Sequence, residues 1–286
     1  MKASLMHKSS VFSLLFSDPD VLRELYSAIE GVTLPDDIPV VINTLGDVLF
    51  MDKINDISFE IGGRLVVLIE HQSTINPNMA LRLLLYIARI YEKIISGRNI
   101  YSTKKLFIPQ PKFFVLYNGT APHPDKAILK LSDMYKSIEP LGLPEKANPV
   151  LELAVTVINI NEGRNKAIAK RCRLLAQYSA FIAKVREYQK EENSLQEALK
   201  KAVVYCRDHD ILKELLEKEA SEVLNMLMTE WNWDDALAVR YEEGIEEGIE
   251  QGIEKTARKA LAEGYQVEEI CKITGLDLDT INKLAK

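Results

Sequence analysis

The chain has 286 residues, with 36 Lys and Arg against 42 Asp and Glu, and a formal net charge of −6. A hydrophobic content of 47% and a charged content of 27% are typical of a globular protein with one or two domains. The negative balance excludes a surface coated with basic charge for nonspecific nucleic-acid binding, although basic residues can still gather at one site. Three scattered cysteines without CxxC spacing and the lack of a long apolar run predict a cytoplasmic protein with no structural zinc and no membrane partner.

The first predicted helix runs from Asp20 to Glu30 and carries one acid of interest, Glu24. Residues 48–50 have the character of a short strand.

Two strand-like runs joined by a glycine turn follow, from Ile54 to Ser73. Because side chains alternate along a strand, the length of the turn decides which residues face each other. A three-residue loop, 62–64, pairs Asp56 with Glu70 and sets two all-apolar rows opposite each other, whereas a two-residue loop mixes apolar with polar residues. Glycine-containing three-residue loops are common in hairpins, so we expect this register.

In that register Asp56, Glu70 and Gln72 share one face. Paired carboxylates with a nearby polar side chain can hold a hard divalent cation against a phosphate. The alternative is a plain solvated hairpin. His71 points to the other face, where we expect a packed or hydrogen-bonded side chain, and its backbone carbonyl is a candidate further ligand.

The next predicted helix begins at Asn76 and Pro77, as N-cap and first helical residue, and ends near Ile95. Its apolar stripe consists of Leu83, Ile87, Ile90 and Ile94. A second stripe is basic with one aromatic, and either binds phosphates beside the metal site or forms a solvated face; it consists of Arg82, Tyr86, Arg89 and Lys93.

The remaining pattern predicts strands at 113–117 and 151–160, an irregular proline-rich crossing between them, and helices from about 164 to 233. Ser194 and Glu197 form a capping box at the start of one of these helices. We therefore divide the chain into a core at 1–165, a helical region at 166–240, a Gly/Glu repeat helix at 241–255 and a helical tail at 256–286.

The repeat places Gly244, Gly248 and Gly252 on one helix stripe at a period of four residues. Three interior glycines cost about 3 kcal/mol relative to alanine, which close approach to a second copy could offset; the alternative is a frayed acidic linker. The tail predicts helices at 267–274 and 277–285 around Gly275, a pattern similar to a helix-turn-helix. Both a DNA reader and a small protein-docking unit fit this pattern.

Several of these segments resemble the recombination-promoting nuclease / putative transposase family (Rpn) of the PD-(D/E)xK nuclease superfamily. The resemblance is carried by NDISFEIGGRLVVLIEHQS, NPNMALRLLLYIARIYEKI, KFFVLYNG and LELAVTVININ, and continues through the later helices and the glycine–glutamate tail. It implies a restriction-endonuclease-like core that hydrolyses DNA with Mg²⁺ (or Mn²⁺), with Asp56 and Glu70 matching the metal-binding acids. Gln72 stands where most of the superfamily has Lys, so it can orient a water molecule but adds no positive charge. Some members of the superfamily place an extra acid in the N-terminal helix, so Glu24 is either such an acid or an ordinary surface glutamate.

Together these observations predict an α/β protein whose mixed sheet is flanked by helices, followed by a helical region and a small helical C-terminal tail. We expect a metal-dependent DNA endonuclease linked to recombination or mobile elements, acting as a homo-oligomer. The competing hypothesis is a noncatalytic DNA-binding or oligomeric scaffold on a degenerate nuclease fold.

Overall fold

A computed structural model describes residues 10–43, 56–142, 149–192, 194–277 and 280–281 of the chain. The chain divides into two compact units, Met1–Met228 and Thr229–Lys286.

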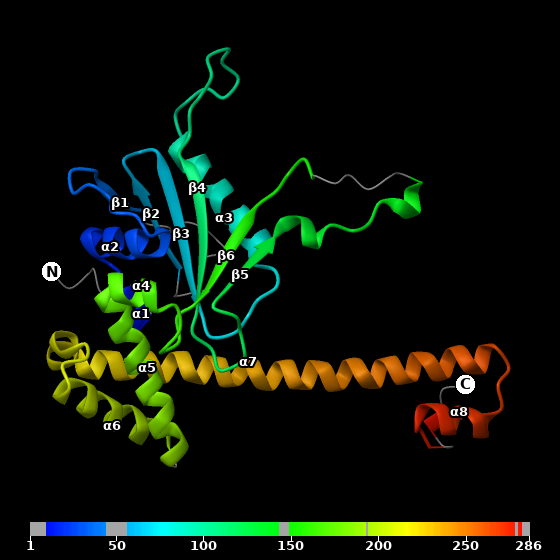
Figure 1. The fold of residues 1–286 in the computed structure, drawn as a ribbon. Coiled ribbons are helices and arrows are strands. Elements are labelled where there is room, and N and C mark those ends of the chain that lie inside the picture. Colours follow the sequence, from blue (N-terminus) through cyan, green and yellow to red (C-terminus); the bar gives the residue numbers. More distant parts are fainter. Residues whose placement is uncertain (1–9, 44–55, 143–148, 193, 278–279, 282–286) are drawn as a thin grey trace. The chain divides into compact units, whose positions relative to one another are not determined.

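The first unit is built on one mixed sheet of six strands in the order β1-β2-β3-β4-β6-β5 (Figure 1). The central strands β3, β4 and β6 run parallel, and the remaining pairs are antiparallel. The strands are β1 (Val40–Ile42), β2 (Asp56–Ile61), β3 (Leu65–Gln72), β4 (Gln110–Tyr117), β5 (Lys126–Lys130) and β6 (Ala154–Asn159). The predicted mixed α/β sheet is therefore confirmed.

The β2–β3 hairpin has the predicted register. Asp56 pairs with Glu70 and Ile61 pairs with Leu65, so the loop contains three residues. Both loop glycines are left-handed, with φ of 58° at Gly62 and 62° at Gly63, a conformation that glycine adopts at little cost. Hydrophobic matching across the two strands thus correctly predicted the loop length.

Helix α3 (Met79–Ile94) covers one face of the sheet (Figure 1). Its stripe of Leu83, Ile87 and Ile90 is at most 4% exposed, and packs in one cluster with Val66 and Leu68 of β3. We expected the helix to begin at Pro77, but its first residue is Met79, two positions later. The Asn76 side chain accepts a hydrogen bond from the Asn78 backbone at 2.9 Å, which forms a turn before the helix rather than its cap.

The opposite face carries α1 (Val11–Leu15), α2 (Pro19–Glu30) and α5 (Arg173–Glu191). Phe12 stacks on His71 of β3 with ring centroids 4.7 Å apart, and Tyr26 meets Phe114 of β4 edge-on at 6.4 Å. The sheet is therefore covered on both sides.

Two short strands were not anticipated. β5 lies inside the segment that we expected to be irregular, and β1 has only three residues. The strand predicted at 151–160 begins only at Ala154, and the strand expected at 48–50 lies outside the described residues.

Two helix ends in the helical region and tail lie where we expected them, and the division of this part at residues 240 and 255 stays a prediction. Ser194 caps α6 by accepting a hydrogen bond from the Glu197 backbone at 3.2 Å, and Gly275 ends α8 in a left-handed conformation. The described part of the final helix covers only residues 280 and 281, and no side chain between 232 and 251 is described. The remaining helices are α4 (Lys166–Arg171), α6 (Leu195–Asp208), α7 (Lys213–Ala262), α8 (Val267–Thr274) and the 3-10 helices η2 (Leu131–Met134) and η3 (Glu139–Leu141).

Candidate functional site

A buried ion pair lies at the carboxyl end of β3. Glu70 is 3% exposed, and its Oε1 lies 2.5 Å from Nη2 of Arg82, a residue of α3. The Arg82 side chain is 20% exposed, so the pair sits at the margin of the core. Burying a carboxylate is costly unless a cation or hydrogen-bond donors accompany it, and Arg82 meets that requirement here.

Gln72 joins the same cluster two residues along the strand. Its Nε2 donates to Glu70 Oε1 at 3.0 Å and contacts the Met79 sulfur at 3.1 Å. Within the described part of the chain, no donor reaches the buried Oε1 of Gln72. A buried amide oxygen in this state is suited to a water molecule or a cation.

The predicted basic stripe of α3 is divided by the structure. Arg82 donates from Nη2 to the Tyr86 hydroxyl at 3.1 Å, and Tyr86 is 4% exposed, so both belong to the Glu70 cluster. Arg89 and Lys93 are exposed farther along the helix, and Arg89 pairs with Glu92 at 2.9 Å. Their role in binding DNA stays a prediction.

Asp56 is placed by its backbone alone. It lies directly opposite Glu70 in the β2–β3 ladder, and its side chain is outside the described part of the structure. Among the described side chains, no group of three His, Cys, Asp or Glu residues is arranged to hold a metal ion.

His71 faces the other side of the sheet, as strand alternation predicted. It is 8% exposed, and its Nε2 lies 3.1 Å from the hydroxyl of Tyr178 on α5. Burial, together with the positive charge of Arg186, lowers the pKa of His71 to about 3. The side chain is therefore a neutral core group, and the backbone carbonyl as a metal ligand stays a prediction.

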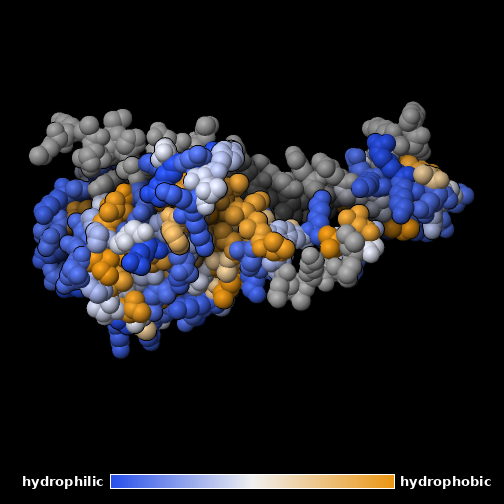
Figure 2. Space-filling view, turned by 90° about the horizontal axis from the view of Figure 1, so that it is seen from above, coloured by the Kyte–Doolittle hydropathy of each residue, from blue (hydrophilic) through white to orange (hydrophobic). Residues whose placement is uncertain are grey.

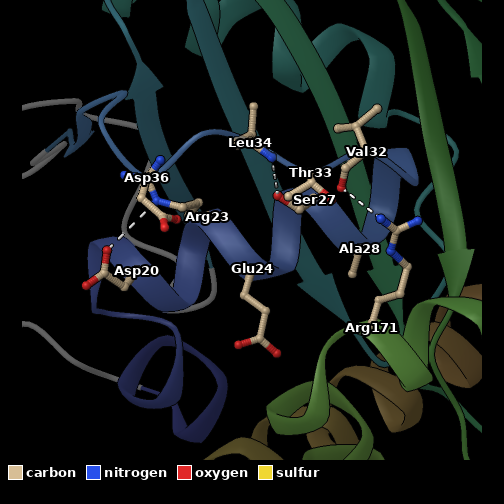
Figure 3. Close-up of a pocket in the computed structure, with 10 residues that line it drawn as sticks. All are labelled: Asp20, Arg23, Glu24, Ser27, Ala28, Val32, Thr33, Leu34, Asp36 and Arg171. Carbon is tan, nitrogen blue, oxygen red and sulfur yellow. Dashed lines mark hydrogen bonds and ion pairs between the residues drawn. The ribbon is translucent and has the colours of Figure 1, made fainter.

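Glu24 is not brought to the Glu70 cluster. It is exposed on α2, across the sheet from α3, and accepts a hydrogen bond from the Arg173 backbone at 3.1 Å at the start of α5. It lines an open groove of about 580 Å³ (Figure 3). The groove's two arginines, Arg23 and Arg171, each donate to two backbone carbonyls, which gives them structural partners already.

A second polar cluster was missed by sequence reasoning. Arg186 of α5 donates to Asn118 Oδ1 at 3.0 Å and to Asn161 Oδ1 at 2.8 Å, and it also reaches the Asn118 carbonyl. The two asparagines follow the parallel strands β4 and β6, so the arginine ties α5 to the carboxyl ends of the sheet. Only the asparagines directly after strands hinted at this cluster, because Arg186 is distant in sequence.

Comparison with known proteins gives one result. The family model described as "Putative transposase, YhgA-like" matches residues 43–224, which include both strands of the hairpin, α3 and the Arg186 cluster. No curated protein and no solved structure matched in the same comparisons. Within the described residues, no helix has the length and apolar character needed to span a membrane. The match covers more than half of the chain, so the chain belongs to the YhgA-like family of transposase-related proteins.

Proposed function

We propose that the protein is a DNA endonuclease that hydrolyses phosphodiester bonds with Mg²⁺ (or Mn²⁺). The observation that supports this most is the register that sets Asp56 opposite Glu70, with Gln72 bonded to Glu70. Membership of a transposase-related family supports a function connected with mobile elements, and DNA is the matching partner.

The residues present fit a divalent cation. Directly opposed residues of an antiparallel pair have β-carbons about 5 Å apart on one face, close enough for two carboxylates to share an ion. The buried Gln72 oxygen adds a hard acceptor beside them. Asp56, Glu70 and the His71 carbonyl would hold the ion. Once bound, it would act as a Lewis acid on the phosphate and lower the pKa of a coordinated water.

The protein's own side chains would supply the rest. Gln72 orients the attacking water through its amide but carries no charge. Arg82 provides a positive charge beside Glu70 and is partly open to solvent, so it can offset the charge that develops on the phosphate oxygens. We propose that Arg82 takes over the electrostatic part that Lys plays at position 72 in most of the superfamily.

A noncatalytic scaffold is the competing function, and one contact favours it. Glu70 Oε1 already forms an ion pair with Arg82 and accepts a hydrogen bond from Gln72. The carboxylate charge is therefore neutralised without any metal. In that case the cluster would only stabilise the junction of β3 with α3.

Plasmid nicking distinguishes the two functions. The wild-type protein is expected to nick supercoiled DNA with Mg²⁺ and not with EDTA, and Asp56→Asn or Glu70→Gln should lower the rate by at least about 10²-fold. Glu60→Gln is the matched control, because Glu60 has the same strand parity as Asp56 in β2 but pairs with Val66.

Wild-type rates in Asp56→Asn and Glu70→Gln would remove the proposed site. A wild-type protein that is inactive with both Mg²⁺ and Mn²⁺ would contradict the endonuclease and favour the scaffold.

A further inference from the structure

A loop with an unusual surface connects α3 to β4. Residues 96–109, here called the 96–109 loop, extend beyond the sheet at the top of Figure 1. Figure 2, seen from above that view, has hydrophobic residues gathered among hydrophilic ones on the first unit. In the loop the exposed apolar side chains are Ile100 (57%), Tyr101 (91%), Phe107 (78%) and Ile108 (47%).

The loop is shaped by its backbone rather than by a core of its own. Its end is anchored where the Tyr91 hydroxyl donates to the Pro109 carbonyl at 2.8 Å. Inside it, Asn99 accepts hydrogen bonds from the Ser102 backbone at 3.1 Å and the Tyr101 backbone at 3.0 Å. The two aromatic rings are exposed and have no core to stabilise, and apolar side chains gathered on a surface are typical of a binding site.

The charge of the loop identifies the kind of partner. It contains Arg98, Lys104 and Lys105 and no acid, and no Asp or Glu occurs between residues 93 and 124, although the whole chain has a net charge of −6. The Lys105 ammonium lies 5.6 Å from the centre of the Phe107 ring. Exposed aromatic rings beside cations fit a ligand with both flat bases and phosphates.

We propose that the 96–109 loop binds an unpaired stretch of a nucleic-acid strand. Bases stack on Tyr101 and Phe107, and the loop's arginine and lysines contact the phosphates. The choice of nucleic acid over an anionic membrane surface rests on the proposed endonuclease function, since the loop and the Glu70 cluster lie in the same unit.

The geometry also gives a spacing. Helix α3 begins at Met79, which contacts Gln72, and its 16 residues make it about 24 Å long. The loop starts just beyond its other end. At the rise of about 3.4 Å per base in a B-form duplex, this length corresponds to roughly seven base pairs between the candidate site and the unpaired bases. Substrates with unpaired bases about that far from the cleaved bond should therefore bind best.

Binding is measured by fluorescence anisotropy with a labelled single-stranded oligonucleotide and its duplex, in EDTA so that no strand is cut. Two double variants test the loop: Tyr101→Ala with Phe107→Ala, and Lys104→Ala with Lys105→Ala. Matched controls are Tyr265→Ala, an exposed tyrosine of the second unit, and Lys126→Ala with Lys136→Ala, two exposed lysines elsewhere in the first unit.

Both loop variants are expected to bind the single strand at least about tenfold more weakly than the wild type, while the two control variants keep full affinity. The lysine variant should also have a shallower salt dependence. Wild-type affinity in the loop variants would overturn the proposal, whether or not the protein cuts DNA.

Two further outcomes would also overturn it: a wild-type protein that binds neither oligonucleotide, and loop variants that lose binding to phosphatidylserine vesicles but not to DNA. The endonuclease proposal is decided separately, by the effect of Glu70→Gln on nicking.

Discussion

At the scale of single residues, the buried Glu70–Arg82 ion pair of the candidate site also contributes to the stability of the fold. The Glu70 and Arg82 side chains are 4% and 20% exposed, so each charge is largely removed from water and is compensated by the other. Taking away one member of such a pair leaves the other charge uncompensated, which costs more than losing an exposed ion pair.

Arg82→Ala should therefore lower the free energy of unfolding by about 2–3 kcal/mol, measured by urea denaturation. Combining it with Glu70→Gln should restore part of this loss, because the buried charge is then gone. Arg89→Ala is the control: its exposed pair with Glu92 should contribute less than about 1 kcal/mol. A double variant no more stable than Arg82→Ala would show that the buried charge is not the cause.

At the scale of elements, the loops that follow β3 and β4 approach each other closely. A β-carbon added at Gly119 would lie 1.8 Å from the Ser73 carbonyl and 2.5 Å from the Tyr117 hydroxyl. The Asn118 backbone also donates to the Gln72 carbonyl at 2.9 Å. The end of β3, which carries the candidate site, is thus held by a contact that only glycine permits.

Gly119→Ala should destabilise the first unit by about 3 kcal/mol or more, because the clash is with backbone that cannot rotate away. Circular dichroism during urea unfolding measures the change. Gly252→Ala is the matched control, since an added β-carbon there meets nothing within 4 Å and should favour the helix by up to about 1 kcal/mol. Equal stability of Gly119→Ala and the wild type would contradict the close approach.

Local patterns predicted much of this unit, and distant pairings were not visible in them. The hairpin register followed from apolar alternation and two glycines within twenty residues. β5 was missed because its edge position leaves alternate residues exposed, so KAILK lacks a buried run. The contact of Arg82 with Glu70 depends on how α3 packs on the sheet, and that of Arg186 with Asn118 spans 68 positions.

At the scale of the whole molecule, the three cysteines differ in how deeply each is buried within its own unit. In the first unit burial raises the pKa of Cys172 to about 12 and that of Cys206 to about 11. Cys271, in the second unit, is only partly buried. Since the thiolate is the reactive form, the two raised values make the first-unit thiols inert.

The native protein should react quickly with Ellman's reagent at Cys271 alone, and at all three cysteines after unfolding in urea. Cys271→Ser should remove the fast phase and leave the slow reaction unchanged. Rapid modification of Cys172 or Cys206 in the folded protein would mean that the first unit opens readily.

β3 is joined to a neighbour on each side: β2 pairs along Leu65–Glu70 and β4 along Leu65–Gln72. Such a strand cannot fray on its own, and its amide hydrogens exchange only when a large part of the sheet opens cooperatively. Glu70 and Gln72 lie on this strand, so heating should leave their arrangement intact until the first unit melts as a whole, and loss of the proposed nuclease activity should coincide with that transition.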